Sequence, residues 1–269
     1  MGLGINTNIP SIFARRQADE TFGRLTNNLE QLSSALRINR ASDDAAGLAI
    51  AERFRTQVRQ FNAEINALQS GISAIEIAEG GLESQQDAVG RLRELAVQAA
   101  NGTLSDQQRQ AINAEAQQLL QEIDATAGNT EFNDRALLDG SNPSLTLETS
   151  GNTTIQFQES TVDSLGLSGL DLSTQAGAQS AIDALDDAGE QISSNRADLG
   201  AQSSRLQSAI ATREEGSENI QSAESRIRDL DLALATIERS RNQLLLRATF
   251  GALAQSNLVN QNAARLLGR

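Results

Sequence analysis

Residues 22–36, Phe22-Gly-Arg-Leu-Thr-Asn-Asn-Leu-Glu-Gln-Leu-Ser-Ser-Ala-Leu36, place large apolar side chains at alternating spacings of three and four: Phe22, Leu25, Leu29, Leu32 and Leu36. This spacing lays a narrow apolar stripe along a helix, which is typical of a coiled-coil seam. A second stripe lies near the other end of the chain and contains Ile220, Ala223, Ile227, Leu230, Leu234, Ile237 and Leu244. The two stripes predict that the chain ends meet in a coiled coil, and that the chain completes itself by packing against copies of itself.

The composition argues against an enzyme. The chain has 269 residues, only 3% of them aromatic, and contains no Cys, His, Trp or Tyr. Without Cys there are no disulfides, thiolate nucleophiles or sulfur metal ligands, and without His the commonest general base and metal ligand is missing. We therefore expect packing through Leu, Ile and Ala, no enzymatic activity, no metal and no cofactor.

Charge is distributed unevenly along the chain. Residues 1–40 hold five Arg against three acidic residues, and residues 230–269 hold five Arg against two, so residues 41–229 carry −18 of a chain whose net charge is −13. An acidic centre repels nucleic acid, and the terminal Arg residues are not clustered on a basic face. We expect no nucleic-acid binding.

No stretch of the sequence approaches the roughly 20 consecutive apolar residues that span a membrane. The first residues, Met1-Gly-Leu-Gly-Ile-Asn6, also lack the charged start and apolar run of a secretory signal. We therefore expect that the chain does not insert into a membrane and that its export does not depend on a cleaved signal peptide.

The hydrophobic pattern predicts a mainly α fold. Helices are expected from Ser11 to about Leu36, from Asp44 to about Asn101, from the capping box at Ser105 onward, and again from about Ala176 into the C-terminal stripe. The fold class is a long-helix coiled-coil bundle with the N- and C-terminal helices paired and one small β-hairpin.

The only β signal in the sequence lies at about residues 144–158. Two short runs there alternate apolar with polar residues, with Leu145 in the first and Ile155 in the second. Ser150-Gly-Asn152 between them predicts a turn, so the segment is expected to form a hairpin.

Two charged groups deserve consideration as sites. Asp43 and Asp44 are the nearest approach to a carboxylate dyad, but neighbouring residues on a helix point apart, so we interpret them as helix-start caps. Arg91-Leu-Arg-Glu-Leu95 is either a salt-bridged helix surface or a contact with a partner, and the sequence leaves both readings open.

Several motifs resemble the bacterial flagellin family, at both ends of the chain and in the right order. They are Ile5-Asn-Thr-Asn8, Leu32-Ser-Ser-Ala-Leu-Arg-Ile-Asn-Arg-Ala-Ser-Asp-Asp-Ala-Ala-Gly-Leu-Ala-Ile50, Arg93-Glu-Leu-Ala-Val-Gln-Ala-Ala-Asn-Gly-Thr103, Glu131-Phe-Asn133, Leu137-Leu-Asp-Gly140, Arg196-Ala-Asp-Leu-Gly200, Ser225-Arg-Ile-Arg-Asp229 and Leu253-Ala-Gln255. The chain departs from many relatives in having no Lys and in placing Ala35 where a glycine is usual.

The resemblance implies a minimal two-domain subunit. Residues 1–40 with 230–269 would form the inner coiled-coil domain of the filament core, and residues 41–229 the outer helical domain with the hairpin. The resemblance further implies self-polymerisation into the filament for swimming motility, a secreted, extracellular location, and as partners the flagellar export apparatus, an export chaperone, and the filament cap and hook-junction proteins. By the same resemblance, Arg91, Leu95 and Glu115 are possible contacts of the animal innate-immune flagellin receptor.

Two alternatives remain open. A hook–filament junction adaptor shares the terminal signatures, although the unbroken segment from Arg93 to Thr103 favours the major filament subunit. A soluble coiled-coil signalling hairpin would form a small dimer without needing its last forty residues.

The acidic centre predicts that salt promotes assembly. The screening length falls from about 30 Å at 0.01 M to about 3 Å at 1 M ionic strength, so repulsion between neighbouring subunits becomes confined to contacts. The critical concentration for assembly should fall steeply from low to molar NaCl, as expected for a protein adapted to saline surroundings. A flat or rising curve would show that the acidic residues are incidental to assembly.

Overall fold

The computed structural model describes residues 7–149 and 151–267. The chain forms two compact units: Met1–Val58 with Glu218–Arg269 is unit 1, and Arg59–Ser217 is unit 2. The predicted division by role, with residues 1–40 and 230–269 as the filament core, stays a prediction. Residues 5 and 6 of the N-terminal signature, residue 150 of the predicted turn and the outermost residues of the predicted core domain lie outside the described residues.

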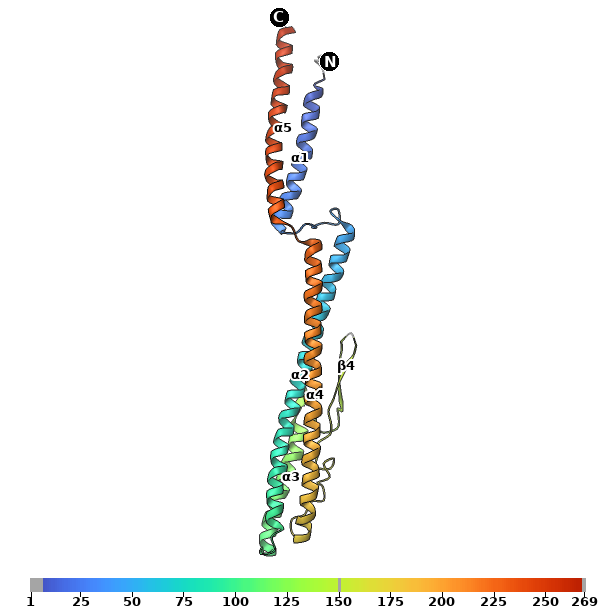
Figure 1. The fold of residues 1–269 in the computed structure, drawn as a ribbon, viewed down its shortest axis with the longest axis vertical. Helices are drawn as coiled ribbons and strands as arrows, with labels where there is room; N and C mark the ends of the chain where they lie inside the picture. The colour runs from blue at the N-terminus through green and yellow to red at the C-terminus, as the bar shows by residue number, and fades with distance from the viewer. Residues whose placement is uncertain (1–6, 150, 268–269) are drawn as a thin grey trace. The chain divides into compact units, whose positions relative to one another are not determined.

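The predicted mainly α fold is confirmed (Figure 1). The described residues form the helices α1 (Ile9–Ser34), α2 (Ala45–Ala99), α3 (Asp106–Asn129), α4 (Gln175–Arg228) and α5 (Leu232–Leu267). They also form the strands β1 (Glu131–Phe132), β2 (Arg135–Ala136), β3 (Ser144–Leu147) and β4 (Thr153–Gln156). As expected, the first and last helices pair with each other.

Local caps define where the helices begin and end. The Asn8 side chain accepts a hydrogen bond from the Ser11 amide (3.1 Å) at the start of α1. Ser105 and Gln108 form the predicted capping box of α3. At the end of α1, Ala35 adopts a left-handed conformation (φ 57°), which favours glycine, and this is the position at which the family resemblance expects one.

Asp43 and Asp44 act locally, as their interpretation as caps predicts. The Asp44 carboxylate accepts a hydrogen bond from the Gly47 amide (2.9 Å) at the start of α2. The Asp43 carboxylate accepts from the amides of Arg40 (2.9 Å) and Asn39 (3.0 Å), and these bonds lower the pKa of Asp43. Both carboxylates therefore serve to shape the start of α2.

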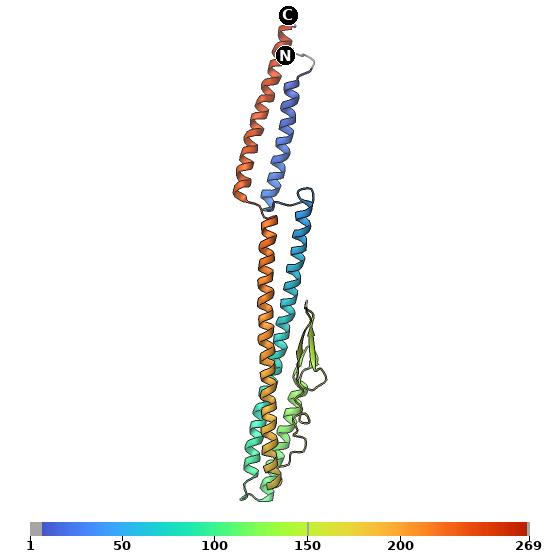
Figure 2. The same ribbon diagram turned by 45° about the vertical axis from the view of Figure 1, so that its right-hand side comes forward.

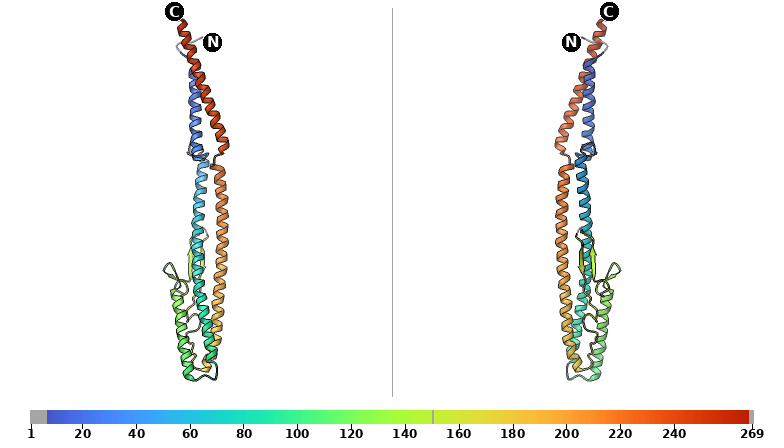
Figure 3. Two further views of the ribbon diagram at one scale, coloured as in Figure 1. Left: turned by 90° about the vertical axis from the view of Figure 1, so that its left-hand side faces the viewer. Right: turned by 90° about the vertical axis from the view of Figure 1, so that its right-hand side faces the viewer.

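Unit 2 is held together by one apolar core between its parts of α2 and α4, the helix α3 and the segment that contains the strands (Figure 3). Its largest fully buried side chains are Leu68, Ile75, Leu82, Leu92, Leu95, Ile123, Leu138, Ile155, Leu167, Leu172, Leu185 and Ile192. Two of the buried polar residues bond to each other: Gln85 donates to the carbonyls of Ile123 (3.1 Å) and Ser160 (2.8 Å), and the Ser160 hydroxyl donates back to Gln85 (2.6 Å). Because both polar side chains are satisfied, their burial costs little.

The predicted hairpin is formed by β3 and β4, with Leu145 paired to Ile155. A second hairpin, β1 with β2, was not predicted from the sequence. Its turn residues Asn133 and Asp134 both have positive φ (53° and 60°), which matches the tight hairpin turns that Asn and Asp tolerate. The Asn133-Asp134 pair between the two short strands is therefore the sequence signal for this hairpin.

The β3–β4 hairpin packs its apolar face on α2 at a glycine. A Cβ added to Gly71 would lie 2.6 Å from Leu147 Cδ1 and 2.9 Å from Ile155 Cδ1. Nothing described lies within 4 Å of a Cβ added to Gly80, which is exposed on the same helix. Gly71 is therefore required for the close approach of the hairpin, whereas Gly80 is not required for packing within the chain.

The two glycines provide a matched test of this packing. Gly80→Ala should stabilise the monomer by about 1 kcal/mol, because alanine is the better helix former. Gly71→Ala should destabilise it by roughly 1–3 kcal/mol, because the added methyl overpacks the contact. Urea unfolding followed by circular dichroism measures both, and equal stability of Gly71→Ala and wild type would contradict the proposed packing.

Candidate assembly surface

Helices α1 and α5 run antiparallel and side by side along unit 1 (Figures 1 and 2). At one end of the pair, Asn8 Nδ2 donates to the Ser256 carbonyl (3.2 Å) and the Ser256 hydroxyl donates to Asn8 Oδ1 (3.0 Å). At the other end, the Leu230 amide donates to the Ala35 carbonyl (3.1 Å). These contacts fix the register of the two helices. A residue of α1 therefore lies opposite the residue of α5 whose number, added to its own, gives about 264.

The segments that lead into the pair are joined to each other. The Arg37 amide donates to the Arg228 carbonyl (2.7 Å), and the Arg37 guanidinium donates to the Ile227 carbonyl at the end of α4. A charged donor at a helix C-terminus satisfies carbonyl groups that the helix leaves free. The start of α5 and the end of α1 are thereby anchored at the same place in unit 1.

The face between α1 and α5, here called the seam, is built mostly of small and polar side chains, with Leu at four of its fourteen positions. In α5, every residue from 232 to 259 that is buried or partly buried falls on one heptad pattern: Ala235, Arg239, Asn242, Leu246, Thr249, Leu253 and Ser256. In α1, the matching pattern is Ser11, Ala14, Ala18, Thr21, Leu25, Asn28 and Leu32. The pair is therefore an antiparallel coiled coil whose interior contains few large apolar side chains.

The large apolar side chains of the same helices point outward. We call the following exposed residues the outer apolar residues: Ile9, Ile12, Phe13, Phe22 and Leu29 of α1, and Leu232, Leu234, Ile237, Leu244, Leu245, Phe250, Leu258 and Val259 of α5. Among the described residues, the only other exposed large apolar side chains are Ile50, Ile77 and Val97. The exposed apolar surface is thus concentrated on the α1–α5 pair.

The predicted stripes only partly coincide with the seam. Phe22, Leu29, Leu234, Ile237 and Leu244 are between 47% and 65% exposed, Leu25 and Leu32 are partly covered within the seam, and Leu36 and Leu230 are partly covered in the segments outside the helices. The chain ends pair as predicted, but these stripes form only part of the contact between the helices, and their role in packing between copies stays a prediction. The observed seam uses Thr21 and Asn28 in place of Phe22 and Leu29, because the helices pack through the smaller residues one position earlier.

Part of the outer surface is concave. Ile237, Leu244 and Leu245 line a shallow groove of about 630 Å³ along α5, together with Thr236, Ser240, Arg241 and Ala248. Full burial of one Leu, Ile or Phe side chain contributes about 1.5–3 kcal/mol. An exposed apolar surface of this extent is typical of a protein that binds another protein through it.

The residues to which the resemblance assigns receptor contacts lie on α2 and α3. Arg91 donates to Glu115 (2.9 Å) and to Glu94 (2.9 Å), and the bond to Glu115 contributes most to the raised pKa of Arg91. Leu95 is only 2% exposed. A contact through Leu95 would need this side chain to be exposed, whereas it shares the inner face of α2 with Leu92 and belongs to the core.

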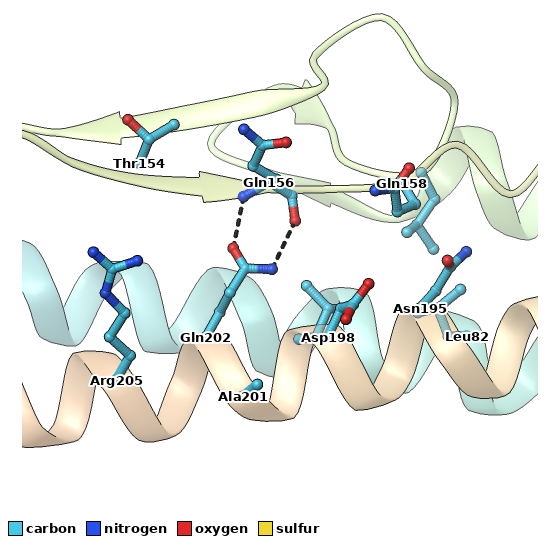
Figure 4. Close-up of a pocket in the computed structure, with 11 residues that line it drawn as sticks. Leu82, Thr154, Gln156, Gln158, Asn195, Asp198, Ala201, Gln202 and Arg205 are labelled. Atoms are coloured by element: carbon cyan, nitrogen blue, oxygen red, sulfur yellow. Dashed lines mark hydrogen bonds between the residues drawn. The ribbon is translucent and has the colours of Figure 1, made fainter.

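A polar groove of about 390 Å³ lies between β4 and α4 in unit 2 (Figure 4). The Gln202 side chain accepts a hydrogen bond from the Gln156 amide (2.7 Å) and donates to the Gln156 carbonyl (3.1 Å), as a neighbouring strand would. Asp198 and Arg205 also line the groove. The groove thus contains an anchor for the edge of β4, and it lacks a nucleophile paired with a base.

Within residues 7–149 and 151–267, no group of three or more acidic residues could hold a metal ion. No helix of the described chain is long and apolar enough to cross a membrane.

Comparison with known proteins agrees with the motifs. Residues 5–143 match the bacterial flagellin N-terminal helical region, and residues 182–267 match the bacterial flagellin C-terminal helical region. A flagellin of Halalkalibacterium halodurans is 40% identical over 98% of this chain and 99% of its own length. The 33 kDa flagellar filament core protein of Treponema phagedenis is 38% identical over the same shares.

Among solved structures, a flagellar hook-associated protein from Vibrio parahaemolyticus is similar in fold. Its TM-score is 0.57 at 16% identity, over 70% of this chain and 100% of that protein. At this identity the similarity concerns the fold alone.

Proposed function

The chain belongs to the bacterial flagellin family and is a structural subunit of the flagellar filament, and we propose that its copies pack together through the outer apolar residues of α1 and α5. The observation that carries the proposal is the distribution of side chains on the α1–α5 pair: the seam is mostly small and polar, with four Leu, whereas thirteen large apolar side chains are exposed. A single chain gains little from such an arrangement. Copies that cover each other's outer residues gain the burial of Phe, Leu and Ile on each subunit.

The proposed roles of the two chain ends and of the central residues rest on the same exposed apolar residues. Residues 1–40 with 230–269 would form the inner core of the filament, because they hold nearly all of the exposed large apolar side chains. Residues 41–229 would form the outer domain, since most of them belong to a unit with its own apolar core and acidic surface. The role of a hook–filament adaptor is not favoured, because relatives that match along nearly the whole chain are filament proteins.

We propose that the other partners of the chain are those of a filament subunit that assembles outside the cell. They comprise the flagellar export apparatus, an export chaperone for the C-terminal region, the filament cap and the hook-junction proteins. An apolar helix such as α5 would need to be covered before assembly, which supports a chaperone there. A chain without Cys is suited to an extracellular location, since it is indifferent to oxidation.

The assembly surface is tested by replacing two of its residues. The double variant Ile237→Ser, Leu244→Ser should raise the critical concentration for assembly at least tenfold. Losing the burial of one such side chain costs about 1.5–3 kcal/mol, and 1.4 kcal/mol already corresponds to a factor of ten. The helix content of the monomer should stay unchanged, since both side chains are exposed. Ile77→Ser is the matched control, because Ile77 is an exposed apolar residue on α2 away from this surface.

Pelleting of filaments across a concentration series gives the critical concentration of each variant. If the double variant assembles as readily as Ile77→Ser, the outer apolar residues are not the assembly surface.

We further propose that Arg91 and Glu115 contact the animal innate-immune flagellin receptor, whereas Leu95, being buried, supports α2 from inside. Arg91→Ala should weaken receptor signalling in a reporter assay without changing the thermal stability of the monomer. Arg93→Ala is the control: Arg93 lies two residues further along α2, and the variant removes its exposed ion pair with Asp186 of α4. If both variants gave the same receptor signal, the ion pairs of Arg91 with Glu94 and Glu115 would be a salt-bridged surface of the monomer and not a receptor contact.

A further inference from the structure

The seam contains buried polar atoms without a hydrogen-bond partner among the described residues, and such atoms lower stability. Asn28 is 4% exposed, and its Oδ1 has no hydrogen-bond partner among the described residues. Nε of Arg239 is likewise buried and unpartnered within the described chain. By the register of the pair, Arg239 faces Leu25 and Asn28 lies within one turn of it on the opposite helix. Together with Asn242, these residues form what we call the polar layer of the seam.

The polar layer continues to the surface as a polar crevice of about 340 Å³. Asn28 and Asn242 line it, together with Arg24, Asn27, Gln31, Glu238, Arg241 and Leu245. The break in apolar packing therefore extends across the width of the pair. A polar residue in the seam of a coiled coil lowers stability and selects one register and partner.

We propose that the polar layer restricts the seam to pairing of α1 with α5 and prevents helices of different copies from pairing through it. In the α1–α5 pair, one Arg239 faces the uncharged Leu25. In a parallel pair of two α5 helices, Arg239 would face Arg239, and the like charges would repel each other at a desolvated position. Two α5 helices in any other register would place two Arg239 side chains in the seam instead of one.

The polar layer thus separates the two faces of the helix pair. The seam is reserved for the chain itself, and the outer apolar residues are left as the face for neighbouring copies. This inference rests on the proposed assembly through the outer face, but it makes a separate statement about which helices can pair. It names Arg239 and Asn28 as residues that determine the specificity of assembly.

The test uses the full chain with Arg239→Leu, and Arg247→Leu as the matched control. Arg247 lies on the same helix, is exposed, and is outside the seam. We expect Arg239→Leu to have a higher thermal midpoint of helix loss and to form dimers that increase with concentration, measured by light scattering at low salt. Its elongation from wild-type seeds should be at least tenfold slower than that of Arg247→Leu. Asn28→Leu provides a second variant and should also form dimers.

A monomeric Arg239→Leu and a monomeric Asn28→Leu, elongating at the rate of the control, would overturn the inference. The light-scattering measurement does not depend on filament growth. If wild-type protein failed to elongate from seeds, the proposed function would fail, while dimer formation by the variants would still support the specificity role of the polar layer.

Discussion

The contact between α1 and α5 determines how the rest of this chain can be used. Its seam contains Ala14 and Ala18 of α1 and, further along the pair, Ala235 of α5, whereas Phe22, Ile237 and Leu244 are exposed to solvent. Small interior residues allow the helices to approach closely, but they bury little apolar surface. The pair is therefore a weak structure in one chain and a suitable building block for many chains.

Unit 2 follows the opposite design. Its large apolar side chains are buried, its interior polar pair of Gln85 and Ser160 is satisfied, and Glu64, which is 4% exposed, forms an ion pair with Arg213 (2.9 Å) between α2 and α4. Large apolar side chains are thus mostly buried in unit 2 and mostly exposed on α1 and α5. Under the proposed assembly, changes inside unit 2 affect the monomer, whereas changes on the outer face of α1 and α5 affect the polymer.

Much of the fold could be predicted from the sequence, because helix caps and heptad spacing are local signals. The capping box at Ser105 and the hairpin at about residues 144–158 follow directly from residue type and spacing, whereas the pairing of Leu145 with Ile155 comes from the structure. The orientation of the terminal helices could not be predicted in this way. Large apolar residues at heptad spacing are usually interior, and only the tertiary register places Asn28 inside and Leu29 outside. Leu95 was misplaced for a related reason, since a charged neighbourhood in sequence does not reveal which side of a long helix faces the core.

Hydroxyl-radical footprinting of monomer and filament tests the central claim most directly. Phe13, Phe22 and Phe250 are between 53% and 67% exposed, whereas Phe157 is 3% exposed and serves as an internal reference. If copies cover the outer face of the α1–α5 pair, the three exposed Phe residues should be oxidised readily in the monomer and become strongly protected in the filament, while Phe157 reacts slowly in both. Unchanged reactivity of Phe22 and Phe250 on assembly would contradict the account.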